Sequence, residues 1–369
     1  MTRRGAWTVG AAFGALVLLA ATGQAVLVRA GMSVYAHAGL PTERALVAGD
    51  FVPLLHAAQA FIHGQPARPW YGGETGLVYA PQYAILLGPF GLLPASAALG
   101  AARVTALGFQ AVALFLWVAA SRQRRVLTMV LLLTSPAIEV VMNGQVMASG
   151  GLLALTLAIW AQRRERWVWA GVALGFGFIR ISNALPLATM LVVVASARPR
   201  RLIALSGGAA LVLGPLTLAA FLWDEGWIAD FLFNIHQFRL SGPLRLVQIA
   251  YGTTGVALVT AANCAICGWI ARRDRGGPID LDRGAAVLAL TVLTATLAGI
   301  YTAVFALPAL VRVAARPGAR YLLWAVAVIP WLLVLALSPW LLGADPQTTL
   351  NYIDTVGPLV LVAAAYPLL

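Results

Sequence analysis

Apolar segments long enough to cross a lipid bilayer recur along this whole chain. A membrane-spanning helix needs about 20 mainly apolar residues. Of the 369 residues 61% are hydrophobic and only 10% are charged, whereas a soluble domain carries about 25% charged residues. The pattern predicts an all-α polytopic membrane protein. No stretch is long and polar enough to form a separate soluble domain, so we expect one integral membrane domain over residues 1–369.

The basic residues are all arginines, and they lie in short clusters between the apolar segments. Such clusters mark cytoplasmic loops under the positive-inside rule. The net charge of +12 therefore reports on topology rather than on nucleic-acid binding. The clusters are Arg3/Arg4, Arg122/Arg124/Arg125, Arg163/Arg164/Arg166, Arg198/Arg200/Arg201, Arg272/Arg273/Arg275 and Arg316/Arg320.

Placing every cluster in the cytoplasm predicts about twelve spans plus one re-entrant or interfacial segment, with both termini inside. An outer loop with interfacial helices is expected over 31–96, followed by the remaining transmembrane bundle over 97–369. The half-span is residues 78–94, which are apolar but short and rich in Pro and Gly. The predicted spans are 7–30, 97–120, 126–141, 146–161, 167–181, 184–196, 201–222, 245–270, 284–300, 303–315, 321–342 and 353–369, with a second outer loop at 223–243.

Asp50 opens the first long polar stretch, directly after the first span. Residues 50–64 can form an amphipathic helix in the membrane interface, with His56 near its first turn. A carboxylate at the bilayer rim is suited to act as a base on a lipid-linked substrate. The alternative is that Asp50 only caps this helix, since Asp is common at helix starts, and that His56 is a polar-face residue.

Two tight outer turns carry further polar residues between apolar spans. Arg180 lies in one turn, close to Asn183, and its guanidinium suits bidentate contact with a phosphate. Structural pairing of Arg180 is the alternative. The other turn contains Asn143 and Gln145, which can bind sugar hydroxyls or cap the flanking helices. Cys264 and Cys267 stand without further Cys or His neighbours and are read as packing residues, so no metal site is expected.

Several segments resemble glycosyltransferase family 87 in their order and spacing over about residues 48–200. They are Asp50-Phe51, Ala57-Ala58-Gln59-Ala60, His63-Gly64, Tyr79-Ala80-Pro81, Leu86-Leu87-Gly88-Pro89-Phe90, Gly144-Gln145, Ala170-Gly171-Val172 and the turn at Arg180. That family usually has Lys-Pro where this chain has Arg180-Ile181, and it often has polar residues near the hairpin at Tyr301.

The resemblance implies a GT-C-like fold and transfer of a sugar from a polyprenyl phosphate to a glycolipid or glycan acceptor. Asp50 would be the general base, and Arg180 with Asn183 would bind the donor phosphate. No cofactor is implied, and metal independence is favoured. Mannose or arabinofuranose is the expected sugar, the plasma membrane the expected location and the extracytoplasmic face the expected side. The candidate substrate-binding residues are Asn143, Gln145, His56, Tyr79, Gln82 and Glu74.

Two other functions fit the same sequence. A transporter or flippase of lipid-linked sugars would use the outer polar residues to bind its cargo, although such sites usually lie at the bilayer midplane. A non-catalytic scaffold for envelope assembly would need none of them.

Overall fold

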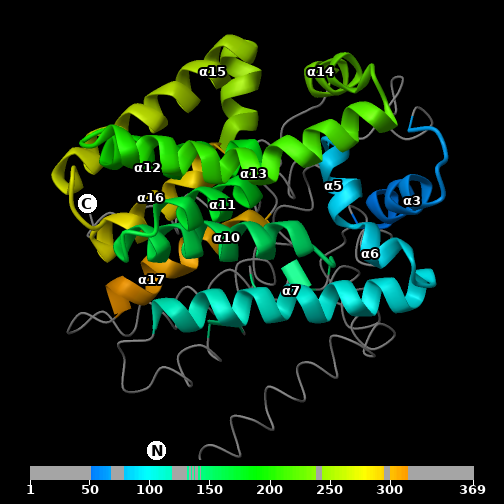
Figure 1. Cartoon of the computed structure of the whole chain (residues 1–369), viewed down its shortest axis with the longest axis horizontal. Helices are drawn as coiled ribbons and strands as arrows, with labels where there is room; N and C mark the ends of the chain where they lie inside the picture. The colour runs from blue at the N-terminus through cyan, green and yellow to red at the C-terminus, as the bar shows by residue number, and fades with distance from the viewer. Residues whose placement is uncertain are drawn as a thin grey trace, which may run out of the picture.

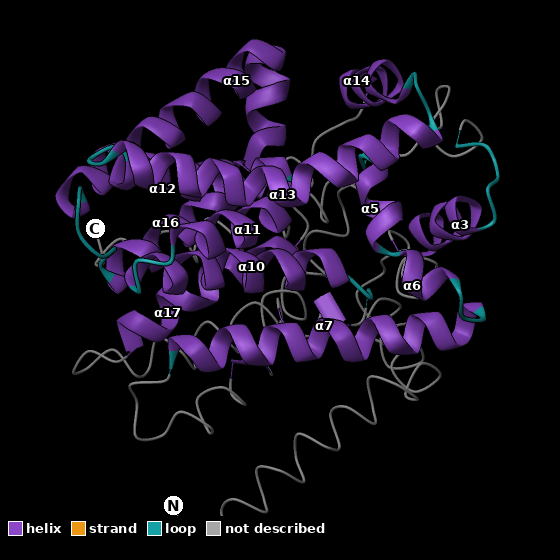
Figure 2. Cartoon of the chain, viewed as in Figure 1, coloured by secondary structure: helices purple, strands orange, loops and turns teal. Residues whose placement is uncertain are grey.

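The computed structural model describes residues 51–67, 79–118, 143–237, 243–294 and 300–314, together with residues 131, 132, 134, 137, 140 and 141. Every regular element in these ranges is a helix, as the composition predicts (Figures 1 and 2). Four of the described helices are long and apolar enough to cross a membrane: α7, α10, α13 and residues 247–274, which include most of α15. These four helices indicate a membrane protein.

The helices follow the predicted spans closely through the first half of the chain. Their bounds are α3 Phe51–Ile62, α5 Pro81–Leu86, α6 Gly88–Gly91, α7 Ala95–Trp117, α10 Val146–Arg163, α11 Trp167–Phe178, α12 Ile181–Ala195, α13 Pro199–Trp223, α14 Trp227–Gln237, α15 Pro243–Ala271, α16 Leu281–Thr294 and α17 Leu307–Ala314, with 3-10 turns at Arg272–Asp274 and Ile300–Ala306. The segment 78–94, expected as a half-span, contains the two short helices α5 and α6. Of the twelve predicted spans, 7–30, 321–342 and 353–369 lie outside the described residues, as does most of 126–141.

Two elements differ from the sequence-based expectation. The second outer loop, expected at 223–243, contains the helix α14, whose Asp230 lies in its first turn. The span expected at 245–270 is bent at Gly252, which has φ 65° and ψ −162° inside α15. Glycine adopts this conformation without the steric cost that a β-carbon would add, so a single continuous apolar pattern produces two helical segments.

Helices α7, α10, α11 and α13 lie side by side across the centre of the molecule (Figure 1). Among the described helices, α11 and α13 cross especially closely. A β-carbon on Gly171 would overlap the carbonyl oxygen of Leu205, and one on Gly208 would overlap that of Val168. Small residues let two membrane helices approach in this way. The Gly171–Gly175 pair therefore serves close packing, as its spacing indicates.

Polar side chains also join the helices inside the bundle. The fully buried Gln110 of α7 donates from Nε2 to Ser149 Oγ of α10, at 3.1 Å. Further along the same pair of helices, Trp117 Nε1 donates to Thr156 Oγ1 at 3.1 Å. Because hydrocarbon offers no alternative partner, such bonds fix the register of α7 on α10.

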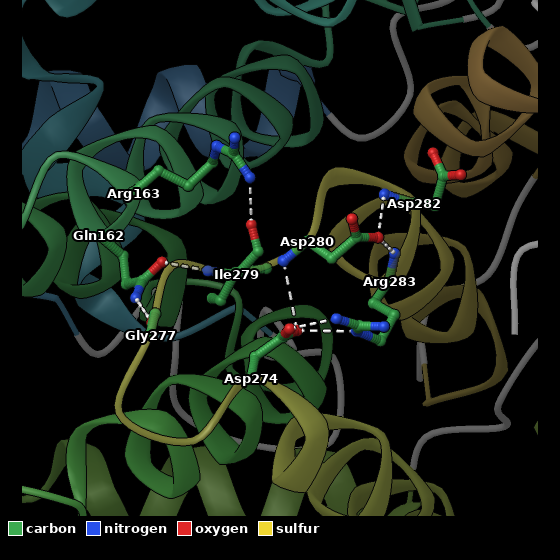
Figure 3. A network of polar contacts seen from close by, with 8 residues as sticks. All are labelled: Gln162, Arg163, Asp274, Gly277, Ile279, Asp280, Asp282 and Arg283. Carbon is green, nitrogen blue, oxygen red and sulfur yellow. Dashed lines mark hydrogen bonds and ion pairs between the residues drawn. The ribbon is translucent and has the colours of Figure 1, made fainter.

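The described arginine clusters meet at one end of the bundle, which we call the arginine end. Arg201 pairs with Glu165 at 2.8 Å and donates to the Gly276 carbonyl oxygen at 2.8 Å. Figure 3 shows the loop after α15 held by the end of α10: Gln162 donates to Gly277 O and accepts from Ile279 N–H, both at 2.8 Å. Loops predicted to share one side of the membrane therefore lie together.

Candidate functional site

An apolar groove runs along the central helices and has a volume of about 690 Å³. Its walls come from α10 and α11, with α7 and the short helices α5 and α6 completing one side. The lining is almost wholly aliphatic and aromatic, and includes Leu86, Phe90, Phe109, Met147, Leu153, Leu157, Val172 and Phe176. Such a lining suits a hydrocarbon chain.

Arginines lie at both ends of this groove. Arg180 lines one end together with Tyr83, and Arg164 and Arg166 line the other. The 18 residues of α10 separate the two ends, which corresponds to roughly 27 Å at 1.5 Å per residue. This length is close to the thickness of the hydrocarbon core of a bilayer. We call the first end of the groove the Arg180 end. The second end of the groove lies at the arginine end of the bundle, and we keep that name for it.

Arg180 sits in the turn between α11 and α12, where its backbone N–H donates to Gly177 O at 3.0 Å. The turn forms because Arg180 leaves the helical region, with φ −110° and ψ 77°. The side chain is nearly enclosed, with 6% of the residue exposed. A charge buried at this depth is costly unless it has partners or a ligand.

Tyr83 faces the same end of the groove and is 3% exposed. Burial raises the pKa of its phenol, and the nearby charge of Arg180 acts in the opposite direction. The phenol therefore stays protonated and can donate a hydrogen bond. Sequence reasoning missed Tyr83, which stands four residues after Tyr79. The two rings are in contact, with centroids 5.1 Å apart.

One small hydrophobic cluster joins the chain neighbours of the predicted site residues. It contains Phe51, which follows Asp50, Tyr79 itself, and Tyr83, which follows Gln82. It also contains Val146, which follows Gln145, and Ile179, which precedes Arg180. Segments far apart in sequence, and predicted to face the same side, therefore converge at the Arg180 end.

The turn Asn143-Gly144-Gln145 precedes α10 at this end. Gly144 has φ +61°, and Gln145 donates its backbone N–H to Val140 O at 2.9 Å. Gln145 is 6% exposed, whereas Asn143 is half-buried. Neither amide lines the groove itself.

Two further predicted residues, Gln82 and Asn183, are buried at 8% and 1% exposure. Asn183 lies in the first turn of α12, with its N–H on Arg180 O, and its Oδ1 accepts from Ser182 Oγ at 3.3 Å. Among the described residues, neither Gln82 Oε1 nor Asn183 Nδ2 has a hydrogen-bond partner. Buried polar atoms are rarely left so, which marks both amides as candidate ligand contacts.

His56 lies apart from the groove. It is exposed on the outer face of α3 and, with Gln59, His63 and Gln65, lines a separate polar pocket of about 460 Å³. Asp50 and Glu74 lie outside the described residues. The part of the chain that the structure describes contains no group of three His, Cys, Asp or Glu side chains able to hold a metal ion.

The Arg180 end therefore combines a buried guanidinium, a protonated phenol and several buried amides with a long apolar groove. This arrangement can hold a phosphate whose ester carries a hydrocarbon chain. Compared with known proteins, the chain matches no protein-family model, no curated protein and no solved structure.

Proposed function

We propose that this protein is a membrane glycosyltransferase that takes its sugar from a polyprenyl phosphate. The observation that carries the proposal is the placement of Arg180, buried at the end of an apolar groove of about 690 Å³. A phosphate bound there would lie where its lipid chain can enter the groove. The resemblance to glycosyltransferase family 87 supplies the sugar, which is mannose or arabinofuranose.

In this proposal Asp50 is the general base. Its carboxylate takes the proton of an acceptor hydroxyl, and the resulting oxygen attacks the anomeric carbon of the donor sugar. The bond between that carbon and the phosphate oxygen breaks, with inversion at the carbon. The polyprenyl phosphate leaves as an anion held by Arg180, with Asn183 beside it, so no acid catalyst is required. Support for this placement is that Phe51, the next residue, belongs to the same cluster as Val146 and Ile179.

The acceptor is a glycolipid or glycan hydroxyl, and the proposal places transfer on the extracytoplasmic side of the plasma membrane. The proposal assigns the amides of Gln82, Asn143 and Gln145 to contacts with sugar hydroxyls at this end. Metal independence remains part of the proposal, because a guanidinium can balance the leaving phosphate without a cation.

The test uses the purified full chain in lipid nanodiscs with labelled polyprenyl-phosphate mannose and polyprenyl-phosphate arabinose. We expect Asp50→Asn to abolish sugar transfer while still binding the donor. We expect Arg180→Gln to weaken donor binding at least tenfold. The matched control is Arg200→Gln, an exposed arginine at the opposite end of the bundle. Full transfer by Asp50→Asn would remove the catalytic assignment, and unchanged donor binding by Arg180→Gln would remove the phosphate site.

One observation favours a second candidate, movement of a lipid-linked sugar between leaflets. The groove has arginines at both ends, about one hydrocarbon thickness apart. If the protein is a flippase, its Asp50→Asn variant would still move labelled polyprenyl-phosphate sugar across a vesicle membrane. Leaflet exchange at the rate of protein-free vesicles would exclude this candidate.

A further inference from the structure

The arginine end of the groove has its own set of polar and aromatic side chains. Arg164 and Arg166 line it, together with Trp160 and Trp169. Both arginines are exposed, and Trp169 is 64% exposed. Tryptophan prefers the level of the lipid headgroups, where an apolar ring meets a polar surface. This end therefore has the composition of a site at the membrane interface.

The turn between α10 and α11 places these two arginines. Glu165 stands between them with φ 58°, a conformation that non-glycine residues adopt infrequently. Its carboxylate is engaged away from the groove, paired with Arg201 at 2.8 Å and accepting from Trp167 Nε1 at 3.0 Å. The one acidic residue in the turn thus neutralises an arginine of another helix, and the mouth of the groove keeps its positive charge.

The Arg164 guanidinium lies over the Trp160 ring, 5.6 Å from the centroid. This contact holds the charged group beside the groove and leaves its N–H groups available to an acceptor. Arg166 donates its backbone N–H to the Ala161 carbonyl oxygen at 2.9 Å, whereas its guanidinium makes no hydrogen bond or ion pair with another described residue. Two guanidiniums at the entrance of an apolar channel complement a lipid that joins an anionic phosphate to a hydrocarbon chain.

We propose that the arginine end binds an anionic phospholipid from the leaflet that it faces. Arg164 and Arg166 hold the phosphate of the headgroup, Trp169 lies beside the glycerol region, and one acyl chain follows the groove past Leu157. The headgroup site is separate from the one in the proposed function, because it uses neither Arg180 nor Asp50, and the two lipids share only the apolar groove. Its residues lie about 27 Å from the Arg180 end along α10.

The positive-inside rule offers a simpler reading in which these arginines only face water. The two readings differ in a way that a matched variant can separate. Arg200 lies at the same end of the bundle and is exposed, but it does not line the groove. A general effect of positive charge would be equal at Arg200 and Arg166, whereas a built lipid site would depend on Arg166 and Arg164 alone.

The experiment is native mass spectrometry of the purified full chain titrated with phosphatidylglycerol or with phosphatidylcholine of identical acyl chains. We expect the first phosphatidylglycerol to bind at least tenfold more tightly than phosphatidylcholine. Arg164→Gln/Arg166→Gln should lose this preference, whereas Arg200→Gln and Arg180→Gln should keep it. Leu157→Trp, which narrows the groove, should weaken both lipids and leave the ratio between them unchanged.

Three results would overturn the site: no headgroup preference in the native protein, the same loss of preference in Arg200→Gln, or loss of phosphatidylglycerol binding in Arg180→Gln. Equal affinity for phosphatidylglycerol and for inorganic phosphate would also overturn it, since the acyl chain would then contribute nothing. Unfolding temperatures of all variants check that the fold is retained. Because donor binding is measured separately with polyprenyl phosphate, failure of this site is distinguishable from failure of the proposed function.

Discussion

Phe51, the first residue of α3, packs directly on Gly144 in the turn before α10. A β-carbon built on Gly144 would lie 3.4 Å from Phe51 Cγ and 3.1 Å from Leu99 Cδ1. This contact ties the segment that follows Asp50 to the turn that carries Asn143 and Gln145. It joins the start of α3 to the turn before α10.

Gly144→Ala is predicted to destabilise this junction. The residue has φ +61°, which costs a non-glycine residue about 1–2 kcal/mol, and the added methyl group presses on Leu99. The matched control is Gly64→Ala, because Gly64 has φ +63° but no atom within 4 Å of a built β-carbon. Unfolding in mild detergent should show a larger loss of stability for Gly144→Ala. Equal losses would mean that the Phe51 and Leu99 contacts contribute nothing.

Gly171→Ala should disrupt the crossing of α11 and α13. Its new methyl group would overlap the carbonyl oxygen of Leu205, a backbone atom that moves only with the helix. Overpacking of this kind costs about 1–3 kcal/mol. Gly207→Ala on α13 is the control, since a β-carbon there meets nothing within 4 Å and alanine favours the helix. The unfolding temperature should fall for the first variant and stay level or rise for the second.

Arg283→Gln is predicted to loosen the loop after α15. Arg283 Nε donates to Asp274 Oδ2 at 2.9 Å, and the Asp274 side chain is only 4% exposed. Removing one partner of a buried pair leaves an uncompensated carboxylate, at a cost of about 3 kcal/mol. Arg312→Gln is the control, because the Arg312–Asp282 pair is more exposed, at 27% and 28%, and should cost at most about 1 kcal/mol. Chemical unfolding that ranks the two variants equally would contradict this account.

Tyr83→Phe should weaken binding of the lipid donor without removing it. The lost hydrogen bond is worth about 1 kcal/mol, so we expect the KM for polyprenyl-phosphate sugar to rise about fivefold. Because burial raises the pKa of this phenol, the wild-type KM should not rise through Tyr83 ionisation up to pH 10, the ordinary value for tyrosine. Tyr251→Phe, at an exposed position on α15, should leave KM unchanged. A tyrosine-dependent rise in KM below pH 10 would argue against the assigned environment.

Gly150→Leu should separate long-chain from short-chain donors. Gly150 lines the groove, and a β-carbon there makes only ordinary contact with Phe109, at 3.5 Å. The leucine side chain can therefore occupy the path of a prenyl chain without displacing a helix. The KM for a long polyprenyl donor should rise about tenfold, and that for a donor with two isoprene units should change little. Gly214→Leu, on an exposed and open position of α13, should affect neither.

Sequence alone determined the helical class and most helix positions. Long apolar segments cannot leave their backbone groups unpaired in lipid, so each one must form a helix. The arginine clusters also predicted which loops share a side, and the described clusters do lie together. The pattern did not reveal α14, because its charged and aromatic residues read as a loop, or the bend at Gly252, because periodicity carries no information about a single φ angle.

For the candidate site, the sequence identified the residue types and the tertiary structure decided which of them meet. Arg180 and Gln145 were predicted from polar turns between spans, and Tyr79 and Gln82 are candidates that accompany the family resemblance. The structure gathers these residues or their chain neighbours around one hydrophobic cluster. The structure separates His56 from these residues, because His56 lies on the exposed face of α3, opposite the face that packs on the cluster. Tyr83 and the groove could come only from the folded chain. A channel between helices depends on the rotation and separation of each helix, and those are set by contacts such as Gly171 on Leu205 rather than by the order of residues within one span.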